Sequence, residues 1–210
     1  MVRVVKDRFA IIGKYARGRD VLDLGCMAYS GAQAAGASWL HRRIASVARE
    51  AVGVDIVGDR TGGSGFRIIK ADVQDPKFDL RRKFDVVVAG ELIEHVADQR
   101  AFLINVRKHL RPGGILIITT PNATSLGIFL RRILKLHGGI STAREHVLIH
   151  DDQTLRRVLE IHGFATDELT YWQIETYGKK KLFSPLLKIW PDMAAHIIAV
   201  ARMRSMKEPA

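Results

Sequence analysis

Short apolar runs alternate with longer amphipathic segments along most of this chain. Five of the runs are rich in β-branched residues and almost continuously apolar, as strands buried on both faces of a sheet are. They span residues 20–24, 51–55, 66–70, 84–89 and 115–120, and two closing strands are expected near 165–171 and 194–202. The alternation predicts an α/β fold built on a parallel sheet.

The segments between these runs carry apolar residues at helical spacing. The sequence predicts helices over residues 39–50, 101–110 and 151–164. Two basic segments remain, at about 121–150 and 172–193. Ligands of open α/β sheets bind beyond the carboxyl ends of the strands. We therefore expect a single domain over residues 1–210, with these two segments as lid-like insertions.

Composition is that of an ordinary globular domain, with 47% hydrophobic and 26% charged residues. Cys26 is the only cysteine, which excludes an internal disulfide and a zinc site of several cysteines and suits a reducing compartment. Residues 1–13 mix charges into an apolar run, unlike a signal peptide, and no apolar stretch is long enough to span a bilayer. We expect a cytoplasmic protein.

The formal net charge of +11 favours acidic partners, unless it only keeps the surface soluble. Basic residues cluster at 131–137 and 178–183. The segment 177–191 mixes lysines with Leu, Phe and Trp, which fits either peripheral contact with an anionic membrane surface or a lid over the acceptor. Nucleic acid is a weaker candidate partner, because we find no recognised RNA-binding module and only 7% aromatic residues. Oligomeric state is left open.

Acidic residues stand at or just past the ends of four of the predicted strands: Asp23, Asp55, Asp72 and Glu91. One such acid is weak evidence, because Asp often caps the next helix. Several in successive units indicate a ligand. A carboxylate after the second strand typically accepts hydrogen bonds from paired ribose hydroxyls, and one after the third can accept from an adenine amino group.

The order of V-L-D-L-G-C, V-G-V-D, A-D-V-Q-D, F-D-V-V-V-A-G-E-L-I-E-H-V and L-R-P-G-G-I-L-I-I-T-T-P-N resembles the class I S-adenosylmethionine-dependent methyltransferases. It is most similar to the branch that contains the ubiquinone-biosynthesis O-methyltransferases. The resemblance covers residues 19–171. It implies a Rossmann-like, seven-stranded, mostly parallel sheet with helices on both faces and an antiparallel last strand, and S-adenosylmethionine as the cofactor.

The resemblance also implies cofactor-binding residues along the carboxyl ends of the first four strands. In chain order they are Asp23, Gly25, Cys26, Met27, Asp55, Ile56, Asp72, Val73, Gly90 and Glu91. The loop after the first strand would frame the methionine moiety. Asp55 would hold the ribose, Asp72 would meet the adenine, and Glu91 would lie beside the sulfonium.

The family's loop reads D-x-G-x-G-x-G, whereas this chain reads D-L-G-C-M-A-Y, with Met27 and Tyr29 at two glycine positions. Glycine there allows positive φ and close approach of backbone to ligand. Small residues at 30–38 leave room for another path. We expect a rerouted loop and a retained cofactor; the alternative is a non-catalytic scaffold with this fold.

Catalytic candidates follow the fourth strand. His95 is a candidate general base and Glu94 lies next to it, although the histidine of this motif also suits an orienting role. An alternative is a divalent metal site of Glu91, Glu94, His95 and His146, which resembles that of small-RNA 2′-O-methyltransferases. We expect no metal. Cys26 lacks a visible activating partner for a catalytic thiol.

The sequence therefore predicts an S-adenosylmethionine-dependent methyltransferase that O-methylates a small-molecule, glycan or lipid-linked hydroxyl. A metal-dependent RNA 2′-O-methyltransferase and the non-catalytic scaffold are the alternatives. Two other histidines carry no motif. His41 faces either the site or solvent, and His109 is expected to be an ordinary helix-surface or loop residue.

Overall fold

The computed structural model describes residues 4–27, 36–59, 65–134, 145–173 and 184–204. An eight-stranded sheet with the strand order β1-β7-β8-β6-β5-β2-β3-β4 forms its centre. The strands are β1 (Val4–Val5), β2 (Asp20–Leu24), β3 (Glu50–Asp55), β4 (Arg67–Lys70), β5 (Phe84–Gly90), β6 (Leu110–Pro121), β7 (Phe164–Trp172) and β8 (His196–Met203).

The last strand, β8, is antiparallel to both of its neighbours, β6 and β7, and the other pairings are parallel. The expected fold class is confirmed. The expected number of seven strands is one too few, because β1 adds a two-residue strand beside β7. So short a strand carries no sequence pattern of its own.

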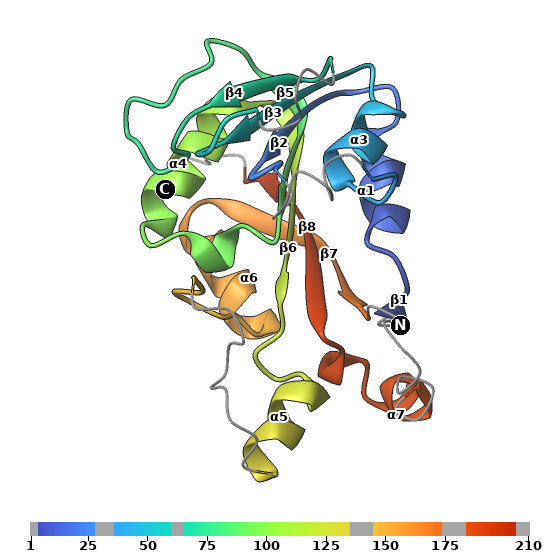
Figure 1. The fold of residues 1–210 in the computed structure, drawn as a ribbon. Coiled ribbons are helices and arrows are strands. Elements are labelled where there is room, and N and C mark those ends of the chain that lie inside the picture. Colours follow the sequence, from blue (N-terminus) through green and yellow to red (C-terminus); the bar gives the residue numbers. More distant parts are fainter. Residues whose placement is uncertain (1–3, 28–35, 60–64, 135–144, 174–183, 205–210) are drawn as a thin grey trace.

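Helices cover both faces of the sheet (Figure 1). On one face lie α1 (Phe9–Ala16) and α3 (Leu40–Ala45), which bury Ile12 and Ile44 against β2, β5 and β8. On the other lie α4 (Gln99–His109) and α6 (Asp152–Ile161), whose apolar sides join a second core cluster. The sheet therefore has apolar cores on both faces, as its continuous apolar strands predicted.

Side-chain caps explain where two of these helices begin. The Asp98 carboxylate accepts a hydrogen bond from Ala101 N before α4, and Asp151 forms a capping box with Thr154 before α6. The helix expected over 39–50 is shorter than predicted, because the chain leaves the helix after Ala45 to enter β3.

Four short elements lie near the carboxyl ends of the strands. The 3₁₀ turn η1 (Ile93–His95) follows β5, and α5 (Leu126–Ile133) follows β6. α7 (Ser184–Ile189) and η3 (Pro191–Met193) precede β8, and α5 and α7 lie at the same end of the molecule (Figure 1). Residues 135–144 and 174–183 of the two expected lids lie outside the described residues, so the lids stay a prediction. In the described parts of the chain, no helix combines the length and apolarity that crossing a membrane requires.

Candidate functional site

The candidate site lies along the edge where the central parallel strands end. Leu24 of β2 pairs with Val54 of β3 and with Ala89 of β5, so the residues that follow these three positions stand side by side. This is the edge at which open α/β sheets bind ligands. It brings the predicted residues Gly25, Asp55 and Gly90 together from three separate parts of the chain.

The turn after β2 depends on Gly25. Its φ is +68°, and a Cβ added there would lie 2.9 Å from Leu92 Cδ1, so a side chain would meet both strain and a clash. The next residue, Cys26, is buried, and burial raises the pKa of its thiol well above the usual range. A catalytic thiolate is therefore disfavoured at this position.

Asp55 at the end of β3 binds the loop after β2. Its Oδ2 accepts a hydrogen bond from Met27 N at 2.9 Å, and its Oδ1 accepts one from Val57 N at 3.1 Å. The neighbouring Ile56 side chain is 62% exposed. The Asp55 carboxylate and the exposed apolar side chain of Ile56 thus lie next to each other beside the loop. Tyr29 lies outside the described residues, so the rerouting of the loop stays a prediction.

Asp72 and Val73 follow β4. Asp72 is exposed, and its Oδ1 accepts a hydrogen bond from Gln74 N at 2.8 Å, which stabilises the local turn. Val73 is buried, and its carbonyl oxygen accepts from Asn105 Nδ2 at 2.9 Å. The turn-forming role of Asp72 is visible, and its contact with adenine remains a prediction.

Glu91 directly follows β5 with a φ of +54°, a conformation that residues other than glycine rarely adopt. Its Oε1 accepts a hydrogen bond from Thr119 Oγ1 at 2.9 Å and lies 3.9 Å from Arg8 Nη1. Its Oε2 lies 3.4 Å from His196 Nε2. Backbone strain of this kind is concentrated at functional sites.

Three residues near Glu91 were not predicted from the sequence: Arg8, Trp172 and His196. The Arg8 guanidinium lies 5.0 Å from the centre of the Trp172 ring, and the Trp172 and His196 rings are 4.4 Å apart. These residues come from the segment before α1 and from the ends of β7 and β8. Only the fold brings them to Glu91, and no local spacing in the sequence signals it.

Glu94 in η1 is buried, with 1% of its surface exposed. Its Oε2 accepts a hydrogen bond from Thr120 Oγ1 at 3.1 Å, whereas Oε1 has no hydrogen-bond partner among the described residues. Burial first, and then the negative charge of Glu91, raise the pKa of Glu94 to about 8. Burial also raises the pKa of Glu91, although 27% of that side chain is exposed and Arg8 acts in the opposite direction.

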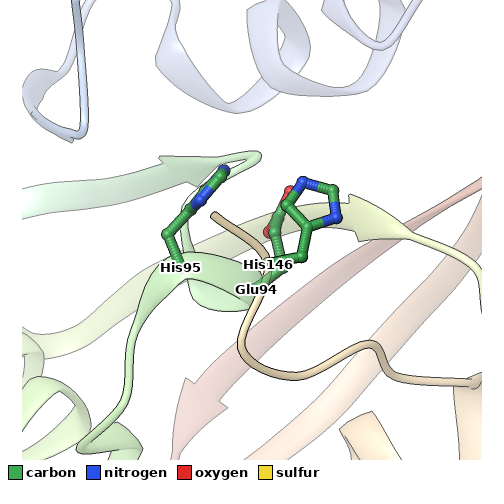
Figure 2. Close-up of side chains that lie close together, drawn as sticks. All are labelled: Glu94, His95 and His146. Atoms are coloured by element: carbon green, nitrogen blue, oxygen red, sulfur yellow. The ribbon is translucent and has the colours of Figure 1, made fainter. Parts of the chain in front are cut away.

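Glu94, His95 and His146 point toward one another (Figure 2). Each offers a ligand atom, and these atoms all lie within 4.8 Å of one another. Burial, followed by the charge of His95, lowers the pKa of His146 and so favours its neutral, metal-binding form. One oxygen and two nitrogen ligands suit ions such as Mn²⁺ or Zn²⁺. Glu91, the fourth residue of the expected set, lies outside this group of three.

Three further histidines are buried and make hydrogen bonds within the protein. His41 is fully buried, and its Nδ1 lies 2.9 Å from Asp23 Oδ2, so it does not face solvent. His109 was expected to be an ordinary helix-surface or loop residue, and this was wrong: it ends α4, is 1% exposed, and its Nε2 accepts a hydrogen bond from Leu80 N. His150 is buried and bonds to Gln99.

Comparison with known proteins agrees with this geometry. A family model described as a methyltransferase domain matches residues 3–169. A ubiquinone biosynthesis O-methyltransferase of Rickettsia conorii is 34% identical over 97 residues, which are 43% of this chain and 30% of that protein. The enzyme of the same name in Sinorhizobium fredii is 26% identical over 201 residues, which are 89% of this chain and 73% of that protein.

The fold also matches solved structures. A SAM-dependent methyltransferase from Archaeoglobus fulgidus superimposes with a TM-score of 0.62 at 17% identity, covering 93% of this chain and 91% of that one. The chain spans 30% to 47% of the length of five of the curated relatives it matches. The family match nevertheless covers most of the chain. The chain belongs to the methyltransferase domain family, as its resemblance to the class I S-adenosylmethionine-dependent methyltransferases predicted.

Proposed function

We propose that this chain is an S-adenosylmethionine-dependent methyltransferase that methylates a hydroxyl group on a small-molecule, glycan or lipid-linked acceptor. The observation that carries the cofactor assignment is the position of Asp55. Its carboxylate ends β3, accepts a hydrogen bond from Met27 N and stands beside the exposed Ile56. Carboxylate oxygens have several acceptor positions each, so Asp55 can also accept from two ribose hydroxyls.

Arg8 and Glu91 extend this cofactor site toward the reacting atoms. When bound, S-adenosylmethionine supplies an electrophilic methyl group on a positively charged sulfur. Arg8 Nη1 lies 3.4 Å from the position that a Cβ on Gly90 would occupy, beside the expected methionine end. We assign Arg8 to the methionine carboxylate. The Glu91 carboxylate would face the positive sulfur.

Glu94 and His95 are the proposed catalytic residues. As the acceptor oxygen bonds to the methyl carbon and the carbon–sulfur bond breaks, the hydroxyl proton must leave. The exposed His95 imidazole can receive it, and so can Glu94 in the ionised form that predominates above its raised pKa of about 8, through the Oε1 that has no partner among the described residues. Alignment of the reacting atoms supplies most of the acceleration, and general-base assistance typically adds about 10² to 10⁴-fold.

Calorimetric titration of S-adenosylmethionine tests the cofactor assignment. We expect micromolar binding to the wild type and roughly 10- to 100-fold weaker binding to Asp55→Ala, because hydrogen bonds to a charged group are lost. Asp79→Ala is a matched control, since Asp79 also accepts from the backbone N–H two residues ahead, outside the site. No binding to the wild type would favour the scaffold alternative.

A second candidate, metal-dependent methylation of an RNA 2′-hydroxyl, is favoured by the grouping of Glu94, His95 and His146. A divalent cation there would bind the Oε1 of Glu94, which none of the described residues contacts by a hydrogen bond, and would hold acceptor hydroxyls. We would titrate Mn²⁺ into the wild type, His146→Asn and the control His162→Asn. We would then compare RNA with small phenols as acceptors, before and after chelation. No Mn²⁺ binding would exclude the metal-dependent route.

A lipid-linked acceptor is favoured by the end of the molecule that carries α5 and α7 (Figure 1). Its large apolar side chains, each at least 49% exposed, are Phe129, Ile133, Leu134, Ile189 and Trp190. Arg131 and Arg132 add positive charge in the last turn of α5. Apolar and basic side chains together suit an anionic membrane surface. Phosphatidylglycerol vesicles should co-sediment with the wild type at low salt, and a smaller fraction of Phe129→Ser should co-sediment with them. No co-sedimentation of the wild type would exclude binding to an anionic membrane surface.

A further inference from the structure

The short helix α3 holds the turn after β2 through two buried hydrogen bonds. Trp39, which precedes α3, donates its Nε1–H to the carbonyl oxygen of Cys26 at 2.7 Å. His41 Nδ1 lies 2.9 Å from Asp23 Oδ2. A carboxylate oxygen only accepts, so Nδ1 carries the hydrogen. The two bonds hold one side chain at the end of β2 and one backbone group of the turn that follows it.

Packing leaves these side chains little freedom. Trp39 is 5% exposed and His41 is fully buried. Phe66 meets both rings edge-on, with its centre 5.2 Å from Trp39 and 5.5 Å from His41. A Cβ on Gly53 of β3 would lie 2.6 Å from Cys26 Sγ and 3.0 Å from His41 Cε1, so only glycine leaves room there.

The arrangement changes the role expected for Asp23. Its carboxylate is 2% exposed and faces His41, so it is not presented to a ligand at the sheet edge. The peptide group that contains the held Cys26 carbonyl also contains Met27 N, which donates a hydrogen bond to Asp55 Oδ2. The bonds to Trp39 and His41 thus determine where the loop meets the proposed ribose-binding carboxylate.

We propose that Trp39 and His41 are positioning residues for the cofactor, which take over the shaping of a loop that lacks two of the family's glycines. The inference rests on the proposed function. Glycines shape such a loop through backbone freedom. Here two side-chain hydrogen bonds from beneath fix its path instead. A buried group left without its partner costs about 1–3 kcal/mol, which is enough to move Cys26 and Met27, where Gly25 is the only glycine of the family's motif that this chain keeps.

The test compares affinities for S-adenosylhomocysteine measured by titration calorimetry. His41→Leu should weaken binding at least about 10-fold, because Asp23 loses its donor in a buried place. His41→Asn should stay within about threefold of the wild type, because an asparagine amide places an N–H close to the position of Nδ1. Trp39→Phe keeps the ring contacts, loses only the bond to Cys26, and should weaken binding several-fold.

His109→Leu is the matched control for damage to the fold. His109 is also buried and also makes short hydrogen bonds, to Asn105 and Leu80, but beneath α4 and away from the cofactor edge. It should lower the unfolding temperature as His41→Leu does and leave the affinity unchanged. Equal loss of affinity in both variants would overturn the proposal, since a general loss of stability would then explain it.

Two further outcomes are decisive. If the wild type binds and both His41→Leu and Trp39→Phe bind equally well, the positioning role is wrong while the proposed function stands. If the wild type does not bind, the proposed function fails and the positioning role fails with it. Should His41→Leu not fold, as judged by circular dichroism, Trp39→Phe decides: an unchanged affinity overturns the proposal, and a weakened one supports it.

Discussion

Acidic residues occupy both ends of the central sheet, but their pKa values shift in opposite directions and their hydrogen bonding differs. At the amino end, Asp20 accepts hydrogen bonds from Arg49 Nε at 2.8 Å and Arg111 Nη2 at 2.9 Å. These partners, Arg49 first, hold the pKa of Asp20 well below its usual range despite burial. At the carboxyl end, burial raises the pKa of Glu94 to about 8 and leaves its Oε1 unpartnered among the described residues.

The difference shows what each end contributes. Ion pairs at the amino end join the starts of four strands: Asp20 of β2, Glu50 of β3, Asp85 of β5 and Arg111 of β6. These charges are satisfied within the chain and serve stability. At the other end, Glu94 is buried with one oxygen that has no partner among the described residues, which costs stability and is typical of sites that receive a ligand.

The largest effect that would sharpen this comparison is expected from Glu94→Gln. The amide keeps the shape of the side chain and can still accept from Thr120, but it cannot take up a proton. At a pH above the Glu94 pKa of about 8, where the wild-type carboxylate is ionised, methyl transfer should fall by at least about 100-fold at saturating cofactor, because general-base assistance is lost. The rate is measured once an acceptor has been found by screening phenols, glycans and lipid-linked alcohols.

The same variant should leave stability nearly intact. The free energy of unfolding, from urea titration, should not fall by more than about 1 kcal/mol, because the lost group was already incompletely bonded. The affinity for S-adenosylhomocysteine should also stay close to that of the wild type. A marked loss of stability with full activity would show that Glu94 belongs with the structural carboxylates of the amino end.

Asp20→Asn should behave in the opposite way. Weakening the hydrogen bonds to Arg49 and Arg111 should lower the free energy of unfolding by about 2 kcal/mol. For a chain of this size that corresponds to a fall of about 4 to 8 °C in the unfolding temperature. Cofactor affinity should not change, since Asp20 lies at the far end of β2. Lost affinity in a folded Asp20→Asn variant would contradict the division of roles between the two ends.

Sequence alone predicted some residues of the candidate site and missed the surroundings of others. The strands and the acids near their carboxyl ends follow from local sequence patterns, so Asp55, Glu91 and Glu94 could be named as candidates without a structure. The histidine at 41 could not be placed, because its burial depends on Trp39, Phe66 and the absence of a side chain at Gly53.

Nonlocal contacts were beyond reach for the same physical reason. Arg8 meets Trp172, and Trp172 meets His196, only because α1 packs on the sheet and β8 lies between β6 and β7. The eighth strand, β1, is two residues long and exists through its pairing with β7. Sequence patterns indicate which face of a helix or strand is buried. They do not indicate which side chain from a distant part of the chain packs against that face.

A smaller effect is expected in the pH dependence of stability. Because its folded-state pKa is lowered, Asp20 contributes stability that is present above its unfolded pKa of about 4 and is lost as pH falls through the folded value. The unfolding temperature of the wild type should therefore fall more steeply below about pH 4 than that of Asp20→Asn. Parallel curves for the two proteins would mean that the carboxylate of Asp20 gains nothing from its arginines.

The smallest effect should come from Glu160, which separates pairing from burial. Like Asp20, it accepts from two arginines, Arg157 at 3.1 Å and Arg204 at 3.0 Å, and these lower its pKa, Arg204 most. Unlike Asp20, its side chain is 42% exposed, so water competes for every bond and salt screens the charges. Glu160→Gln should leave the unfolding temperature unchanged within error at both low and high salt. A fall as large as that of Asp20→Asn would show that pairing with arginine alone stabilises these carboxylates. An unchanged value would show that a paired carboxylate stabilises this fold only where the sheet also buries it.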